Sequence, residues 1–130
     1  MAPTFNFIGM VVTDLPASLA FYRRLGLDLP ADADTQGHVD IDLPGGFKLA
    51  WDSVEEIRKF DPSWQQPTGV GRTSLAFACD SPADVDKLYA ELVAAGHPGH
   101  REPFDAFWGQ RYATVLDPDG NGVDLYALLS

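Results

Sequence analysis

The chain has 130 residues, 45% of them hydrophobic, which suits one domain with a real core. Its formal net charge is −10, from 19 acidic against 9 basic side chains, and no run of Lys or Arg occurs. We therefore expect neither nucleic acid nor an anionic membrane as a partner. No window approaches the ~20 apolar residues of a membrane span, and the N-terminus lacks a basic and apolar leader, so we expect a cytoplasmic location.

The first half of the sequence predicts a strand, a helix and a hairpin in that order. Residues 5–12 are apolar and rich in β-formers, Asp14 can cap a helix over about 16–25, and Gly26 can end it. Alternation over 39–43 and 47–51, on either side of the turn 44–46, predicts the hairpin. Ser53 and Glu56 have capping-box spacing, which predicts a short helix to about Phe60.

The same pattern returns after a linker-like stretch over about 61–71. Residues 74–79 predict a strand, Ser81 and Pro82 begin a helix, and Gly96 ends it. We expect a loop up to residue 110, then strands over 111–116 and 123–128 joined by the turn 117–122. A shift of 67 positions aligns the two helices, so the chain contains an internal repeat.

Four short motifs carry a family resemblance that covers essentially the whole chain. They are VTDL at 12–15 and SLAFY at 18–22 in the first half, and YATV at 112–115 and DPDGN at 117–121 in the second. They resemble the vicinal oxygen chelate superfamily, which includes glyoxalase I, extradiol dioxygenases and antibiotic-binding proteins of the bleomycin-resistance type. The resemblance implies an α+β fold of two βαβββ modules, at about 1–60 and 72–130. Their curved half-barrel sheets usually enclose a ligand within a homodimer.

The resemblance also implies four positions for a divalent metal, two in each module. Enzymes of the family typically carry a His in the first strand of each module and a Glu-like ligand in the last. The matching positions fall on Phe7, Lys48, Ser74 and Asp124. Phenylalanine has no donor atom, an ammonium repels a cation and a hydroxyl is a weak ligand, so only Asp124 remains. We expect no metal and no other cofactor, and we interpret His38, His97 and His100 as surface or loop residues.

Aromatic side chains can supply affinity in a cleft without a metal. Loop tryptophans present flat faces for stacking, whereas core packing is a sufficient explanation for aromatic residues within periodic elements. Arg111 could orient a polar ligand group or pair with an acidic side chain, and Lys48 could pair with Asp124. The sequence predicts no catalytic residue. The predicted ligand-binding residues are Phe7, Tyr22, Lys48, Trp51, Trp64, Ser74, Phe104, Phe107, Trp108, Arg111, Tyr112 and Asp124.

The leading functional hypothesis is metal-independent sequestration of an aromatic natural-product antibiotic, which would confer resistance without a chemical step. Bleomycin-like, mitomycin-like, quinoxaline and anthraquinone compounds are the classes considered. An alternative is a metal-independent enzyme in which Lys48, Asp124 or Tyr112 transfers a proton, although no triad is visible. A metal-dependent glyoxalase or dioxygenase, and a scaffold domain without a small ligand, are further alternatives.

Overall fold

The computed structural model describes residues 2–68 and 73–129. The chain divides into two compact units, residues 1–67 and residues 68–130, called unit 1 and unit 2 below. Residues 69–72, which include the end of the expected linker, lie outside the described residues.

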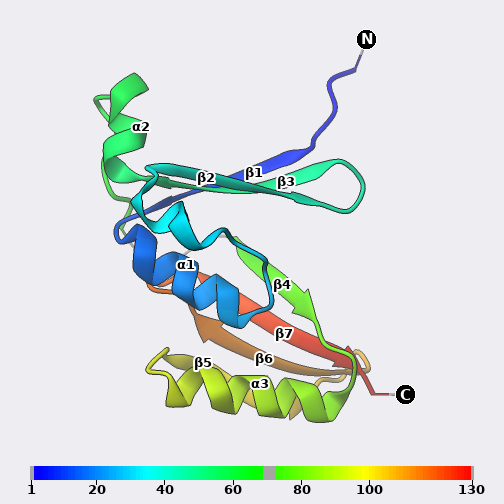
Figure 1. Cartoon of the computed structure of the whole chain (residues 1–130). Helices are drawn as coiled ribbons and strands as arrows, with labels where there is room; N and C mark the ends of the chain where they lie inside the picture. The colour runs from blue at the N-terminus through cyan, green and yellow to red at the C-terminus, as the bar shows by residue number, and fades with distance from the viewer. Residues whose placement is uncertain (1, 69–72, 130) are drawn as a thin grey trace. The chain divides into compact units, whose positions relative to one another are not determined.

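Unit 1 contains a three-stranded mixed sheet in its described part. Its elements are β1 (Phe7–Val12), α1 (Leu15–Arg24), a 3₁₀ helix (Ala31–Thr35), β2 (His38–Leu43), β3 (Phe47–Ser53) and α2 (Val54–Phe60). The strand order is β1-β3-β2, with β3 parallel to β1 and antiparallel to β2 (Figure 1). The predicted strand, helix, hairpin and short helix are all present.

The first helix is fixed at both ends by the residues that predicted it. The side chain of Asp14 accepts a hydrogen bond from the backbone N–H of Ala17 at 3.1 Å. Gly26 has a φ of 91°, a conformation that glycine adopts without strain, and it closes the helix. α1 buries Tyr22 against Trp51, with ring centroids 5.4 Å apart. This contact is part of the core of unit 1, which also buries Leu19 and Phe21 of α1.

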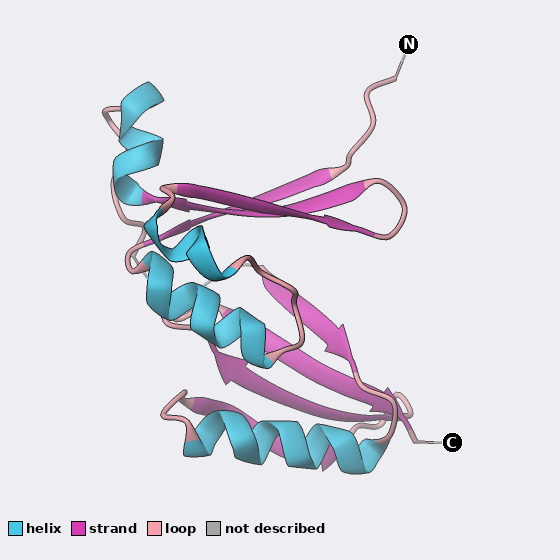
Figure 2. Cartoon of the chain, viewed as in Figure 1, coloured by secondary structure: helices cyan, strands magenta, loops and turns pink. Residues whose placement is uncertain are grey.

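Unit 2 contains a four-stranded sheet and one long helix in its described part (Figure 2). Its elements are β4 (Ser74–Ala78), α3 (Pro82–Ala94), β5 (Gly99–Asp105), β6 (Gln110–Leu116) and β7 (Gly122–Leu128). The strand order is β4-β7-β6-β5. The predicted α+β class is confirmed, and unit 2 has the complete βαβββ order.

The two faces of the unit 2 sheet differ in composition. α3 buries Val85 and Leu92, and the buried strand residues are alternate ones: Ala113, Val115, Val123, Leu125 and Ala127. Because side chains alternate along a strand, the residues between them point to the other face. We call this second side the open face. It carries Ser74, Phe104, Tyr112, Thr114, Asp124 and Tyr126, as the strand pairing requires.

One expectation about unit 2 is wrong. The stretch before residue 110 was expected to be a loop, but residues 99–105 form β5 and pair with β6. This segment lacks apolar alternation and contains Pro103, so its sequence resembles a loop although it can occupy a sheet edge. No helix among the described residues is long and apolar enough to cross a membrane.

Candidate functional site

The carboxylate of Asp124 is the centre of a hydroxyl cluster on the open face. Its Oδ2 accepts hydrogen bonds from Tyr112 Oη at 2.6 Å and from Ser74 Oγ at 3.2 Å. Its Oδ1 accepts one from Thr114 Oγ1 at 2.7 Å. Strands β4, β6 and β7 each supply one or more of these residues, so the sheet register itself assembles the cluster. Two of its members, Ser74 and Asp124, were aligned from the sequence with metal positions.

Tyr112 remains a neutral hydrogen-bond donor at physiological pH. Burial raises the pKa of Tyr112 to about 12, and the hydrogen bond to the Asp124 carboxylate and its charge act in the same direction. A phenol with this pKa keeps its proton and donates a hydrogen bond to the carboxylate. The pair is therefore suited to holding a fixed polar surface and poorly suited to accepting a proton from a ligand.

Aromatic rings lie beside this cluster. Tyr112 stacks with Tyr126 at a centroid distance of 6.5 Å and meets Phe104 edge-on at 6.4 Å. Trp108 lies 5.4 Å from Tyr112 and 6.2 Å from Phe104. The contacts bring three residues of the predicted binding set together: Phe104, Trp108 and Tyr112.

The hairpin loop between β5 and β6 presents Phe107 and Trp108. Gly109 has a φ of 93°, and the backbone N–H of Gly109 donates to the carbonyl of Ala106 at 3.0 Å, which closes the loop. The indole N–H of Trp108 donates to Gln110 Oε1 at 2.8 Å, so the ring orientation is fixed. Phe107 is 97% exposed and Trp108 is 49% exposed, which leaves aromatic surface accessible.

Arg111 lies on the face that α3 covers. Its Nε and Nη2 donate to Asp86 of α3 at 2.9 and 3.2 Å, and its Nη1 lies 3.1 Å from Asp105. Of the two roles considered for Arg111, the structure shows the ion pair with acidic side chains. Arg111 of β6 therefore links this strand to α3 and to the neighbouring strand β5.

Lys48 belongs to a charged cluster on unit 1. Its Nζ lies 2.7 Å from Asp42 and 3.4 Å from Asp40. His38 Nε2 lies 2.8 Å from Asp40, and its Nδ1 lies 2.5 Å from Asp52. The hydrogen bonds to Asp40 and Asp52 raise the pKa of His38, because only the protonated ring can donate to both. Lys48 thus has carboxylate partners within its own unit.

The strand register corrects the alignment of Lys48 with a metal position. In unit 2, Asp124 pairs with Ala76, two residues after Ser74. In unit 1, the residue paired with Gly9, two residues after Phe7, is Ala50. Ala50 and not Lys48 is therefore the counterpart of Asp124. Lys48 instead pairs with Phe7 across β1 and β3.

The residues at the four positions do not fit the metal that the family resemblance implies. Phe7 and Ala50 have no donor atom, and the hydroxyl of Ser74 already donates to Asp124. Asp124 is the one charged oxygen donor of the set, whereas protein metal sites use three or four ligands. Within residues 2–68 and 73–129, no group of three or more His, Cys, Asp or Glu could hold a metal ion.

The remaining predicted residues lie in unit 1. Tyr22 and Trp51 are fully buried, and the hydroxyl of Tyr22 donates to the sulfur of Met10 at 3.6 Å, so we assign both aromatic residues to packing. Phe7 is 44% exposed on β1. Trp64 packs against Arg58, whose guanidinium lies 5.9 Å from the ring centroid and whose Nε donates to the Trp64 carbonyl at 3.3 Å.

Thr114 and Tyr126 of the open face were missed from the sequence. Thr114 bonds Asp124, and Tyr126 stacks on Tyr112. Each lies two residues from a predicted site residue in a strand that was itself predicted, so the period of two could have found both.

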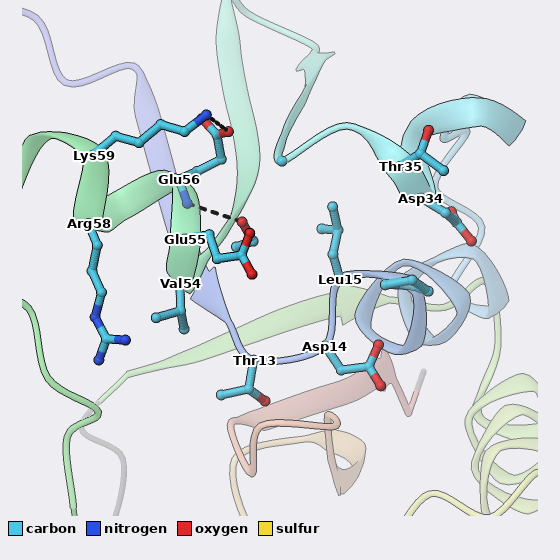
Figure 3. A pocket seen from close by; sticks show the side chains of 13 residues that line it. Thr13, Asp14, Leu15, Asp34, Thr35, Val54, Glu55, Glu56, Arg58 and Lys59 are labelled. Atoms are coloured by element: carbon cyan, nitrogen blue, oxygen red, sulfur yellow. Dashed lines mark hydrogen bonds and ion pairs between the residues drawn. The ribbon is translucent and has the colours of Figure 1, made fainter.

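Unit 1 also contains a polar hollow of about 720 Å³ (Figure 3). It lies between the start of α1, the 3₁₀ helix and α2, and Asp14, Glu55 and Arg58 line it. Lys59 at its rim is paired with Glu56 at 2.6 Å. None of the predicted ligand-binding residues lines this hollow. We therefore place the candidate site on the open face of unit 2.

The chain repeats a strand, a helix and a pair of antiparallel strands, which defines a two-module α+β protein. Comparison of the sequence with family models identifies the family. The chain belongs to the Glyoxalase/Bleomycin resistance protein/Dioxygenase superfamily, whose family model matches residues 4–125. No curated protein matches the chain.

Solved structures show the same fold. A glyoxalase/bleomycin resistance protein/dioxygenase family enzyme from Burkholderia phytofirmans PsJN has a TM-score of 0.81 and 21% identity, covering 98% of this chain and 100% of its own. A glyoxalase/bleomycin resistance protein/dioxygenase from Nocardioides has a TM-score of 0.75 and 28% identity, covering 100% and 86%. A lactoylglutathione lyase from Agrobacterium tumefaciens has a TM-score of 0.67 and 23% identity, covering 97% and 94%.

Proposed function

We propose that the chain binds and sequesters a flat aromatic natural product, such as an antibiotic, on the open face of unit 2, without a metal. The main support for this proposal is the hydrogen bonding of the Asp124 carboxylate. Its carboxylate accepts three hydroxyl hydrogen bonds beside a set of packed aromatic rings. A carboxylate held this way offers polar recognition, and the rings offer apolar area.

The aromatic part of the face supplies most of the expected affinity. Trp108 is fixed by its bond to Gln110 and contacts both Phe104 and Tyr112, yet about half of its surface is accessible. A ring that is already oriented loses little conformational entropy when a ligand stacks on it. Phe107, at the tip of the same loop, extends the apolar surface.

A metal-independent enzyme is the second candidate. The 2.6 Å bond between Tyr112 and Asp124 places a phenol and a carboxylate together at the site, as an acid–base pair would require. Sequestration is favoured because the raised pKa of Tyr112 keeps it protonated and because Asp124 is already bonded to three donors.

Calorimetric titration of metal-stripped protein with aromatic antibiotics of the four classes, followed by mass analysis of the recovered compound, tests the proposal. We expect saturable binding at one ligand per site and recovery of the unchanged compound. Conversion of the compound would instead support the enzyme. Trp108→Ala should weaken binding by about 1 to 3 kcal/mol, a stacking-sized loss. Phe60→Ala, which removes a 77% exposed ring from unit 1, is the control and should leave affinity unchanged.

The family resemblance also implies a homodimer, and we include it in the proposal. Size-exclusion chromatography with light scattering should give twice the chain mass of 14.2 kDa. If the protein is a monomer at the concentrations used for the binding titration, the proposed dimer is wrong. The proposed binding face on unit 2 is then tested by the titration alone.

A further inference from the structure

An irregularity in β5 brings Arg101 onto the open face. Arg101 pairs with Thr114, and Phe104 pairs with Tyr112, so three steps along β5 match two along β6. In a regular strand, residues three apart point to opposite faces of the sheet. The extra residue of the bulge lets both Arg101 and Phe104 share one face. The contact between them agrees, since the Arg101 guanidinium lies 4.1 Å from the centroid of the Phe104 ring.

The pairing arranges the open face in two adjacent rows. The polar row contains Arg101, Thr114 and Asp124, which pair successively across β5, β6 and β7. The aromatic row contains Phe104, Tyr112 and Tyr126, paired across the same strands. Because neighbouring strands lie about 4.8 Å apart, the backbones at Arg101 and Asp124 are about 10 Å apart. A cation and an anion thus stand at the two ends of one row, with rings alongside.

Arg101 of β5 differs from Arg111, which lies in the neighbouring strand β6 and points to the other face of the sheet. Arg111 pairs with Asp86 and Asp105. Within the described residues Arg101 makes no ion pair, although the chain has 19 acidic side chains, and its guanidinium lies over a ring instead. Stacking orients an arginine while leaving its N–H donors available.

Asp124 can accept a further hydrogen bond. A carboxylate has about four acceptor directions, and three are used by Ser74, Tyr112 and Thr114. The remaining direction belongs to Oδ1, which accepts from Thr114. A ligand group that donates a hydrogen bond can therefore be held at this end of the polar row.

We propose that Arg101 determines specificity by binding an anionic oxygen of the ligand. The ligand class is a flat aromatic acid with a carboxylate at one end and a hydroxyl or amino group at the other. Arg101 holds the carboxylate, Asp124 accepts from the donor group, and the aromatic row with Trp108 contacts the rings. This inference depends on the proposed function, because it assumes that an aromatic ligand occupies this face.

The test compares two probes by isothermal titration calorimetry: a hydroxynaphthoic acid with its two groups at opposite ends of the rings, and its methyl ester. Wild-type protein should bind the acid about tenfold more tightly than the ester, the size of a charge-assisted hydrogen bond at a partly exposed site. Arg101→Gln should remove this preference by weakening binding of the acid more than binding of the ester. Arg101→Lys should retain part of it, since a lysine keeps the charge and loses the planar fork.

Arg24→Gln is the matched control. It removes the same charge from the exposed end of α1 in unit 1, so it reproduces any general effect of net charge, and it should keep the preference for the acid. Thermal melts of each variant separate loss of binding from loss of folding. Equal binding of acid and ester by wild-type protein, or equal loss of both in Arg101→Gln, overturns the role of Arg101 while the proposed function stands. Binding of neither probe overturns the inferred ligand class, and the antibiotic titration described above decides the proposed function separately.

Discussion

Replacing Tyr112 by Phe removes one hydroxyl and leaves the ring that packs against Trp108 and Tyr126. The lost interaction is a 2.6 Å hydrogen bond to the Asp124 carboxylate. Hydrogen bonds to charged groups contribute about 1.5 to 3 kcal/mol. Asp124 keeps Thr114 and Ser74 as donors and is partly accessible to water, so we expect the lower end of this range, about 1.5 kcal/mol, in the free energy of unfolding.

Urea unfolding at neutral pH measures this loss. Tyr126→Phe is the control, because Tyr126 stacks on Tyr112 and its hydroxyl is not part of the Asp124 cluster; its loss should stay below about 0.5 kcal/mol. The folded pKa of Tyr112 is raised from 10.0 to about 12, so its contribution is fully present below pH 10 and is lost as pH rises through about 12. The gap between wild type and Tyr112→Phe should narrow over this range. Equal losses of unfolding free energy in Tyr112→Phe and Tyr126→Phe at neutral pH would show that the hydrogen bond from Tyr112 to Asp124 does not stabilise the fold.

Three further predictions concern the scaffold around the site. Arg111→Gln should cost at most about 1 kcal/mol of unfolding free energy, and less in high salt, because its ion pairs are partly exposed. Ligand affinity should not change, and a large loss of affinity would show that Arg111 contacts the ligand. Asp117→Ala should lower the free energy of unfolding by about 2 to 3 kcal/mol, because the buried Asp117 carboxylate accepts hydrogen bonds from the backbone N–H groups of Asp119 and Asn121. An unchanged midpoint in urea unfolding would show that these hydrogen bonds do not stabilise the fold. Because the pKa of His38 is raised in the folded protein, its ion pairs stabilise the fold fully below pH 6.5, and this stabilisation is lost as pH rises through the folded pKa. Across the neutral range the melting temperature should therefore change less with pH in His38→Gln than in wild type.

Local signals predicted most of the secondary structure. The N-caps Asp14, Ser53 and Ser81 each accept a hydrogen bond from the first turn of the helix that they were predicted to begin. Gly26 and Gly96 both have positive φ values where helices were predicted to end. These signals act within a few residues, which is why sequence alone finds them.

Strand register could not be predicted in the same way. The offset of 67 residues aligns Phe7 with Ser74, but Lys48 was placed from the family pattern, by its position after the turn 44–46. The strand register assigns Ala50 as the counterpart of Asp124 instead. Arg101 was missed because the bulge in β5 breaks the alternation that assigns side chains to faces. Both errors concern pairings between strands, which local patterns do not encode.

The regular strands β4, β6 and β7 bring together three residues that the sequence named. Ser74, Tyr112 and Asp124 were named from the sequence, and the structure brings their side chains into hydrogen-bonding contact. Phe104, Phe107 and Trp108 were named as aromatic candidates, and they lie in ring contact beside them. Whether these contacts bind a ligand stays a prediction.

Metal-independent binding can be tested by one calorimetric titration performed twice, with the same aromatic antibiotic, in excess chelator and again with added Zn²⁺ or Mn²⁺. We expect the same dissociation constant and one ligand per site in both titrations, because the residues at the four metal positions supply one charged oxygen donor. Binding that occurs only after the metal is added would show that ligand binding depends on a metal.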